Sequence, residues 1–468
     1  MIAFVRPSAP LNRYIQNVPL NYVHLAAYLR EHGYEAPLIL DEIFDDVTPE
    51  AVDRTIRERK IEVVGIGCMT CELPQAIAEA KRLKAAHPEL KVVFGGPHPS
   101  GDPEECLRTG AVDYVIVGEG EIALVALLDA IRNGRDTTQI PGVWTIREDR
   151  VIAGGRAPVP EIEALPRPAF DLLDLERYFE LDSPWHFPKS RRAVQFITER
   201  GCPYQCSYCH DIHTKKFRAL SPEAVLDQME WLVRTYGVRE FMIVDDIFNF
   251  NLERAKTICR GIVDRKLAVH LQFPNGVRGD RFDEELTALM KHAGTHYMAI
   301  AIETVSTKFQ KLVRKNLKID RARQALTWAR SNGIEVSGFF MIGFPGESLA
   351  EVRETLDFAL SEPFDSVFVS IVAPFKGTKL RDDMESGKFG EMTEQGVAAL
   401  NELFPIVHNQ ALPHELLLKL QRECYWKFYR RPRAIFLLTR KLTNLRNVKK
   451  LARAVTRRVM DRREVSVN

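Results

Sequence analysis

The sequence predicts an α/β protein in three parts: a Rossmann-like domain over residues 1–150, a partial (β/α)6 barrel over residues 189–385 and a helical region over residues 386–468. Short apolar strands alternate with helical segments in the first two parts, which is the pattern of buried parallel sheets. Between them, residues 151–188 contain the proline-rich stretch APVPEIEALPRPAFDLL, which is typical of a linker.

The composition agrees with a folded protein of two or three domains. The chain has 468 residues, of which 45% are hydrophobic and 27% charged, as in ordinary globular proteins. Its longest apolar runs are well short of the roughly 20 residues that a membrane-spanning helix needs. The N-terminus reads as a strand entering a loop and has no signal-peptide pattern, so we expect a cytoplasmic location.

The first domain is expected to contain a doubly wound parallel sheet. Strands are predicted at residues 2–7, 36–42, 61–67, 91–96 and 113–121, with helices at residues 23–33, 72–87 and 103–110. Ligands of such sheets bind beyond the carboxyl ends of the strands. Two of these ends are rich in glycine, Gly95-Gly96-Pro97-His98 and Gly118-Glu119-Gly120, and they mark the expected binding crevice.

The second region contains six consecutive strand–helix units. Its strands are predicted at residues 193–199, 240–246, 271–277, 297–304, 335–344 and 366–374. Six such units favour a partial barrel or a barrel-like curved sheet.

The C-terminal region concentrates positive charge. From Lys427 onward fourteen Lys or Arg residues stand against two acids, a local charge of +12 in a chain whose net charge is +2. Apolar residues recur there every three or four positions, which predicts a basic amphipathic helix or helix pair: Ile435, Leu438, Leu442, Leu445, Val448, Ala452, Val455 and Val459. Peripheral contact with the inner face of the membrane and packing against the barrel both explain such a helix. Aromatics beside Arg430 and Arg431 suggest base stacking, but packing explains the apolar stripe better, so no nucleic-acid partner is expected.

Three of the eight cysteines, Cys202, Cys206 and Cys209, lie within eight residues. Each thiolate can bind one iron of a cubic [4Fe-4S] cluster, and the lack of a fourth nearby cysteine leaves one iron open to an outside ligand. A zinc site that also uses His210 and His213 is the alternative.

The other five cysteines are expected to be buried apolar residues. Cys68 and Cys71 form a CxxC, but it follows a strand and does not open a redox helix.

The CxxxCxxC motif directly after the first strand of a six-unit barrel resembles the signature of the radical S-adenosylmethionine (SAM) superfamily. This resemblance implies that SAM binds the open iron and is cleaved to a 5′-deoxyadenosyl radical, with electrons from a flavodoxin or ferredoxin. It also implies nucleotide or substrate contacts from the aromatic before the third cysteine and from residues at successive strand ends: Tyr208, Asp245, Arg278, Glu303 and Gly343. Each of these has an alternative explanation as a helix cap or turn.

The first domain resembles the cobalamin-binding domains that are fused to radical enzymes, through the segments GIGCMT, GGPHPS and VGEGE and the helix after VPLNYV. The cofactor-binding residues that this resemblance implies are Thr70, Gly95, Gly96, His98, Gly118, Glu119 and Gly120. No DxHxxG motif is present, so no histidine is expected below cobalt, and His98 is not assigned that role. A domain that kept the fold but lost the cofactor is the alternative; a dinucleotide site is weaker because no GxGxxG follows the first strand.

Together the two domains resemble cobalamin-dependent radical SAM enzymes. The resemblance implies methylation of an unactivated carbon, in a hydrophobic small molecule such as a hopanoid lipid or a tetrapyrrole. A non-methylating cyclase, a carbon–carbon coupling enzyme or a rearrangement enzyme is the alternative. The sequence identifies no catalytic nucleophile or base, because the cofactors carry the difficult chemistry.

Overall fold

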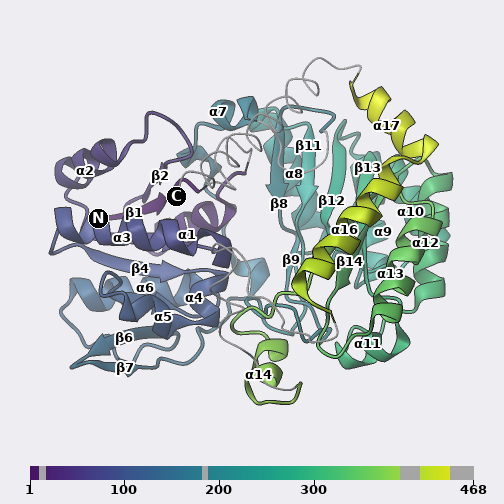
Figure 1. Cartoon of the computed structure of the whole chain (residues 1–468). Helices are drawn as coiled ribbons and strands as arrows, with labels where there is room; N and C mark the ends of the chain where they lie inside the picture. The colour runs from purple at the N-terminus through teal and green to yellow at the C-terminus, as the bar shows by residue number, and fades with distance from the viewer. Residues whose placement is uncertain (10–16, 182–187, 390–411, 443–468) are drawn as a thin grey trace.

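In the computed structural model the chain forms two α/β domains, each built on its own sheet, followed by C-terminal helices (Figure 1). The structure describes residues 1–9, 17–181, 188–389 and 412–442. None of the helices in these ranges is long and apolar enough to cross a membrane.

The first sheet has seven strands in the order β2-β1-β3-β4-β5-β6-β7. Its strands are β1 (Ile2–Arg6), β2 (Leu38–Asp41), β3 (Val63–Gly67), β4 (Lys91–Gly95), β5 (Tyr114–Ile116), β6 (Val143–Arg147) and β7 (Arg150–Ile152). The sheet is parallel through β5, as predicted, and the antiparallel strands β6 and β7 extend it. This hairpin was not predicted, because its two turn residues at positive φ are Glu148 and Asp149 and include no glycine, which usually marks such a turn.

Helices cover both faces of this sheet, which is the doubly wound arrangement. Alternate residues of each strand serve the two faces, so that Ala3 and Val5 pack on one side while Ile2 and Phe4 pack on the other. The helices are α1 (Leu20–Glu31) and α6 (Gly120–Arg132) on one face, and α2 (Pro49–Glu58), α3 (Leu73–Ala86) and α5 (Pro103–Arg108) on the other, with the short α4 (Pro97–Gly101) after β4. Of these, α2, α4 and α6 were not predicted.

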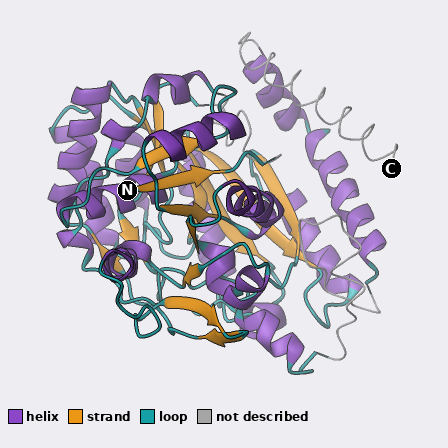
Figure 2. Cartoon of the chain, turned by 90° about the vertical axis from the view of Figure 1, so that its left-hand side faces the viewer, coloured by secondary structure: helices purple, strands orange, loops and turns teal. Residues whose placement is uncertain are grey.

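The second sheet confirms the six-unit barrel prediction. All neighbouring strands are parallel and follow one another in chain order: β8 (Ala193–Phe196), β11 (Glu240–Ile243), β12 (His270–Val277), β13 (Thr295–Glu303), β14 (Glu335–Ile342) and β15 (Ser366–Ile371). Its outer helices are α8 (Pro222–Tyr236), α9 (Leu252–Asp264), α10 (Glu284–His292), α11 (Thr307–Leu312), α12 (Ile319–Ser331) and α13 (Leu349–Ser361). Helices α10, α12 and α13 lie at the right-hand side of Figure 1, and Figure 2 views the chain from the side of the first domain.

Two C-terminal helices, α16 (His414–Tyr429) and α17 (Pro432–Leu442), lie at the far edge of the barrel. The helix α14 (Lys379–Glu385) instead packs against Phe309 and Phe344 near the cysteine-rich loop. Gln421 and Tyr425 of α16 bond the backbone of Val369 in the edge strand β15, with Val369 N donating to the Tyr425 hydroxyl at 2.9 Å. A helix over an edge strand blocks pairing with another chain. The predicted apolar and basic positions from residue 443 onward lie outside the described residues, and the domain boundaries at residues 150, 188 and 385 stay predictions.

Candidate functional site between the two sheets

The cysteine-rich loop spans residues 201–217 between two short paired strands. These strands, β9 (Glu199–Arg200) and β10 (Arg218–Ala219), close its base. Gly201 opens the loop at φ +91°, and a Cβ there would lie 2.2 Å from the carbonyl oxygen of Lys216. Only glycine therefore lets the two ends of the loop approach this closely.

The three thiols of the loop form one group. The Cys209 thiol donates a hydrogen bond to Cys206, and this bond, together with the nearby charges of Lys315 and Arg278, lowers the pKa of Cys206 to about 6 although burial opposes the shift. Burial raises the pKa of Cys202 to about 11. Three thiols beside two cations are a donor set that fits an iron–sulfur cluster, because the cations balance thiolate charge. Within the described ranges no three His, Cys, Asp or Glu side chains converge on the position of a single metal ion.

Two acids that follow β11, Asp245 and Asp246, hydrogen-bond the residues at the start of this loop and just before it. Asp245 is buried and accepts from both the backbone nitrogen and the hydroxyl of Thr198, at 2.6 Å for the nitrogen. Asp246 accepts from Gly201 N at 2.7 Å and lies 3.0 Å from Nδ1 of His213. Asp246 thus joins the two ends of the loop, a function that its position after a strand did not reveal.

Charged groups from the carboxyl ends of β12 and β13 surround the thiols. Arg278 lies 3.7 Å above the ring of Tyr204 and also bonds Asp280. Glu303 ends β13 at φ +68°, and its Oε1 lies 3.1 Å from Nζ of Lys315. The sequence analysis missed Lys315, because it sits in an irregular segment after α11 with no motif around it.

Two further predicted residues border the thiols on the β14 side. Tyr208 is half-buried, and its hydroxyl bonds the Cys206 thiol while its ring lies 6.3 Å from that of Phe344. Gly343 follows β14 at φ +87° and donates its N–H to Glu347 at 2.6 Å. A Cβ at Gly343 would lie 2.7 Å from a methyl carbon of Leu417 in α16, so a side chain there is excluded.

The predicted glycines of the first domain differ in what they face. A Cβ on Gly95 would meet nothing nearer than 4.0 Å, which leaves an open cradle at the end of β4. Gly96 and Gly118 have positive φ, and Gly96 packs against the backbone of Cys68. Gly120 packs against Leu25. The open end of β4 fits a large planar ligand that must approach the backbone closely.

The polar candidates of the first domain fall into two groups. Thr70 and His98 lie together, with 3.2 Å between Oγ1 and Nδ1, and Nε2 of His98 is 3.3 Å from Glu105. Glu119 instead turns toward the barrel and bonds Arg200 and Arg218. Neither arginine was identified from the sequence.

The carboxyl ends of the two sheets meet at the cysteine-rich loop. A Cβ on Gly101 of α4 would lie 2.4 Å from the Lys376 carbonyl oxygen and 3.3 Å from the ring of His210, the residue after Cys209. Arg156 donates to the loop carbonyl of Ile212 at 2.8 Å. The loop is therefore enclosed between the crevice of one domain and the barrel of the other.

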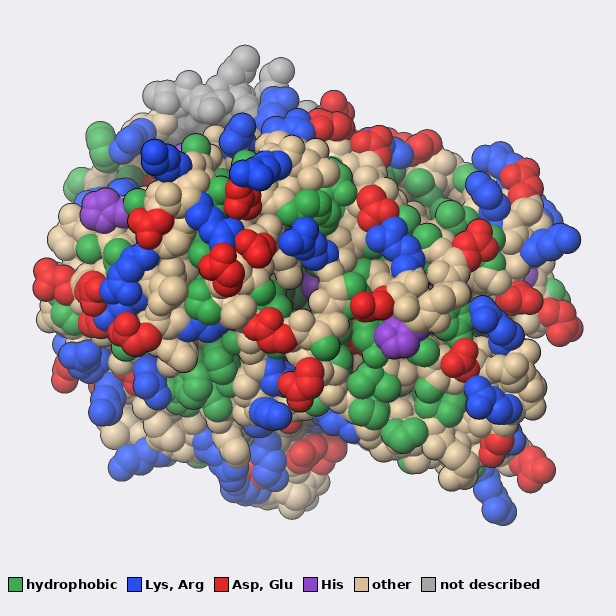
Figure 3. All heavy atoms as spheres, turned by 180° about the vertical axis from the view of Figure 1, so that it is seen from behind, with side chains coloured by type: hydrophobic (Ala, Val, Ile, Leu, Met, Phe, Trp, Pro, Cys, Tyr) green, Lys and Arg blue, Asp and Glu red, His purple; other side chains and the backbone are tan. Residues whose placement is uncertain are grey.

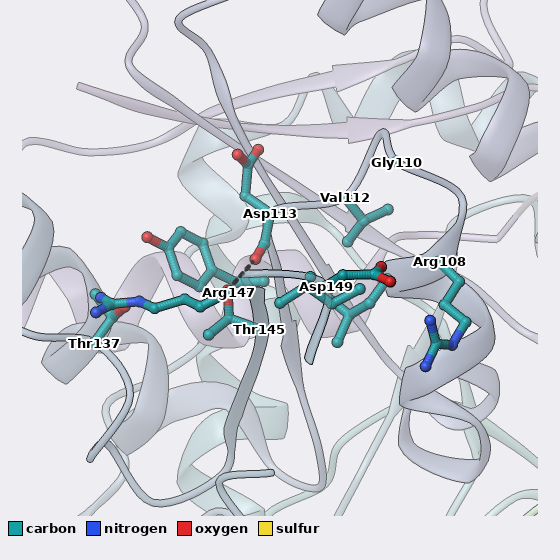
Figure 4. Close-up of a pocket in the computed structure, with 11 residues that line it drawn as sticks. Arg108, Gly110, Val112, Asp113, Thr137, Thr145, Arg147 and Asp149 are labelled. Atoms are coloured by element: carbon teal, nitrogen blue, oxygen red, sulfur yellow. Dashed lines mark hydrogen bonds between the residues drawn. The ribbon is translucent and has the colours of Figure 1, made fainter. Parts of the chain in front are cut away.

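A separate surface cavity of about 590 Å³ lies at the opposite, amino end of β5 (Figure 4). Its polar side chains are occupied: Arg108 pairs with Glu104 at 2.6 Å, Arg147 pairs with Asp136 at 2.9 Å, and Thr145 bonds the Asp113 carbonyl. Because ligands of α/β sheets bind at the other edge, we do not assign the function to this cavity.

Two family models match the chain in the order that the fold suggests. Residues 12–128 match the B12 binding domain, and residues 196–359 match the radical SAM superfamily.

Curated relatives cover most of the chain. A protein of Pyrococcus horikoshii named as an uncharacterized methyltransferase is 28% identical over 89% of both chains. The cytidylyl-2-hydroxyethylphosphonate methyltransferase of Streptomyces wedmorensis is 27% identical over 81% of this chain and 80% of its own. The anaerobic magnesium-protoporphyrin IX monomethyl ester cyclase of Rubrivivax gelatinosus is 26% identical over 73% of this chain and 61% of its own.

The fold also matches a solved structure. The radical SAM methyltransferase TsrM of Kitasatospora setae, solved with cobalamin and a [4Fe-4S] cluster, superposes with a TM-score of 0.70 at 20% identity, over 84% of this chain and 76% of its own. At this identity the likeness establishes the fold.

Proposed function

This chain is a cobalamin-dependent radical SAM enzyme, and we propose that it methylates an unactivated carbon of an apolar small molecule. One observation carries the proposal: the cysteine-rich loop of the barrel lies against the B12-binding domain, through Gly101 of α4, and against the segment that follows this domain, through Arg156. Two reactive centres that must exchange a methyl group and a radical need this proximity.

In the proposal, Cys202, Cys206 and Cys209 hold a [4Fe-4S] cluster by three irons, and the open cradle at Gly95 receives cobalamin. When bound, these groups and SAM supply the 5′-deoxyadenosyl radical and the methyl group. The protein's own part is to align the reactants and to exclude water. The apolar cluster of Phe309 and Phe344 beside Tyr208 serves the second purpose.

The charged residues around the thiols are proposed to orient SAM. Arg278 can offer Nη1 to the carboxylate of SAM, because its Nε pairs with Asp280 and its Nη2 bonds the Lys315 carbonyl. Glu303 is held by Lys315 and can accept a hydrogen bond from the amino group of SAM. Gly343 is given no part in binding the adenosine, because Leu417 fills the space beside it and Glu347 accepts its N–H. Asp246 holds the start of the loop through Gly201 N. A flavodoxin or ferredoxin is the proposed electron donor.

An apolar substrate is favoured by the inner face of the barrel. Phe339 and Phe368 are register partners on β14 and β15, and their rings lie 5.5 Å apart. A Cβ on Gly276 of β12 would lie 3.4 Å from that of Ala301 and 3.5 Å from Phe339. Since Phe368 is 45% exposed, this surface is available to a hydrophobic molecule of the hopanoid or tetrapyrrole kind.

The experiment compares products under anaerobic conditions with deuterated-methyl SAM and three substrate classes: hopanoid lipids, tetrapyrroles and cytidylyl phosphonates. Methyl transfer to carbon requires two SAM molecules per turnover, so we expect equal amounts of S-adenosylhomocysteine and 5′-deoxyadenosine and a product that carries the deuterated methyl group. A product that gains no methyl group, formed together with 5′-deoxyadenosine but without S-adenosylhomocysteine, would reject methylation. The enzyme would then be a radical cyclase or a rearrangement enzyme, an alternative that the name of the Rubrivivax relative favours. Turnover of the phosphonate alone would reject the apolar substrate.

We also propose that α16 and α17 rest on an anionic membrane. Trp426 and Phe436 are 66% and 62% exposed, and Arg430 stacks on Trp426 at 5.1 Å. Exposed aromatics beside cations are the pattern of interfacial helices, whereas acids and bases intermingle on the opposite face (Figure 3). Flotation with vesicles that contain phosphatidylserine should carry the protein, and the W426A/F436A double variant should float less. Equal flotation of both proteins removes the idea, and binding to oligonucleotides that survives moderate salt favours nucleic acid instead.

A further inference from the structure

The base of the cysteine-rich loop contains an unfavourable pair of charges. Arg200 of β9 and Arg218 of β10 are register partners in the two-residue ladder that closes the loop, and both residues are only 5% exposed. Like charges directly opposite each other destabilise an antiparallel pair, and burial increases that cost. The hairpin therefore needs negative charge from elsewhere.

That charge comes from the other domain. Glu119 accepts from Arg200 Nη1 at 2.8 Å and from both terminal nitrogens of Arg218, one of them at 3.3 Å. Glu121, the second residue of α6, accepts from Arg200 Nη1 at 2.7 Å. Burial opposes ionisation of Glu121, but the Arg200 charge outweighs it and lowers the pKa of Glu121. Two buried carboxylates thus balance two buried guanidinium groups across the domain boundary.

The same strand end touches the loop a second time. Gly118 has φ +99°, and a Cβ there would lie 3.3 Å from the side chain of Arg156. Without a side chain at Gly118, Arg156 can pass over the strand end and bond the carbonyl oxygens of Asp211 and Ile212, in the middle of the loop. The segment from Gly118 to Glu121 therefore lies against both the base and the middle of the loop.

We propose that Glu119 is a positioning residue that fixes the cysteine-rich loop to the first domain, and that it does not bind the corrin. This proposal deepens the proposed function, on which it rests for the role of the loop as cluster holder. Its physical content is that formation of the loop base depends on a carboxylate that only the B12-binding domain supplies. Loss of that carboxylate should loosen the loop before it affects the crevice.

The variant set separates charge from shape. E119Q keeps the shape but leaves two buried cations against one carboxylate. E119D keeps the charge with a shorter reach and should rescue part of the effect. The double variant E119Q/R218Q removes one cation as well and restores the balance, so it should recover more than E119D if charge repulsion is the cause. E104Q is the matched control, because Glu104 pairs with Arg108 on the surface with both side chains about half exposed.

The first measurement is tryptic cleavage of the full chain, free of cluster and cobalamin, at Lys215 and Lys216 within the loop. We expect E119Q to be cut at least about tenfold faster than the parent, because the cleavage rate follows the population of the open loop. The cleavage rate of E119Q/R218Q should return most of the way to that of the parent. E104Q should behave as the parent. Since this readout needs no cluster, it stands even where the proposed function fails.

The second measurement is binding and spectroscopy on reconstituted protein. The dissociation constant for hydroxocobalamin should change by less than about twofold in E119Q. SAM changes the electron paramagnetic resonance spectrum of the reduced protein, and this change should be weaker in E119Q and restored in the double variant. Unchanged loop cleavage in E119Q overturns the proposal. So does loss of cobalamin affinity with an intact loop, or a double variant cut as fast as E119Q.

Discussion

Replacing Lys315 by methionine tests how the charged residues around the thiols are held. Lys315 Nζ lies 3.1 Å from Glu303 Oε1, and the two side chains are 8% and 12% exposed. Removing one partner of a buried ion pair leaves an uncompensated charge and costs about 3–5 kcal/mol. Glu303 also sits at φ +68°, in a region that is strained for residues other than glycine. Gln310 bonds the carbonyl oxygens of Ile302 and Thr304 on either side of it, and Lys315 holds its side chain.

We therefore expect K315M to lower the local stability around residues 295–317 by about 3 kcal/mol, near the lower end of that range because both groups retain some access to water. Such a loss corresponds to hydrogen–deuterium exchange about a hundredfold faster in this segment. The affinity for SAM should fall as well, since Glu303 loses its fixed orientation. Exchange measured by mass spectrometry and SAM binding by equilibrium dialysis give the two readouts.

Two controls separate this explanation from a general loss of stability. E303Q/K315M removes both charges and should recover most of the protection. R108M removes an exposed pair with side chains about half accessible, for which about 0–1 kcal/mol is expected. The reasoning is refuted if K315M exchanges no faster than R108M, or if the double variant is less protected than K315M.

Two further predictions concern the contact between the sheets and the turn after β14. A Cβ on Gly101 would lie 2.4 Å from the Lys376 carbonyl, so G101A should lower the thermal midpoint by the equivalent of about 1–3 kcal/mol. The control is G110A, where a Cβ meets nothing within 4 Å, and it should cost only backbone strain of about 1 kcal/mol. Equal thermal midpoints of G101A and G110A would contradict the contact between Gly101 and Lys376. Burial raises the pKa of Glu347 to about 7, so its protonated form stabilises the fold at low pH, and this contribution is lost as pH rises toward and through 7. Urea unfolding at pH 5, 6 and 8 should therefore show a loss of up to about 3 kcal/mol that is absent in E347Q; parallel pH profiles would argue against it.

The features that were predicted correctly from the sequence are local ones. Strand periodicity is contained in a few residues, and it predicted the parallel strands of both sheets. The roles inferred from the glycine-rich strand ends and from the spacing of Cys202, Cys206 and Cys209 stay predictions. The β6–β7 hairpin was missed because its turn residues at positive φ, Glu148 and Asp149, include no glycine.

The supporting contacts of the site could not be read in the same way. Glu119 and Arg200 are 81 residues apart, and no pattern in either segment reveals that one neutralises the other. Asp245 follows a strand in the manner of a ligand-binding acid, yet both of its oxygens bond Thr198. Pairing over such distances depends on tertiary structure, which periodicity does not encode.

The nucleic-acid interpretation of the aromatic segment depends on which rings are accessible. Phe428 is fully buried, and the Tyr425 hydroxyl is bonded to β15. Trp426 alone of these three faces solvent to a large extent, under Arg430. A run of aromatics in the sequence therefore overstates the stacking surface, because every third or fourth residue of α16 faces the barrel.

The central claim is that three neighbouring thiolates hold an iron–sulfur cluster with one iron free for SAM. The direct test is anaerobic reconstitution of the full chain, followed by iron and sulfide analysis and an assay for SAM cleavage after reduction. We predict about four irons and four sulfides per chain, formation of 5′-deoxyadenosine, and loss of both in C206S. A reconstituted protein that holds no four-iron cluster, or that holds one and never cleaves SAM, would contradict the account.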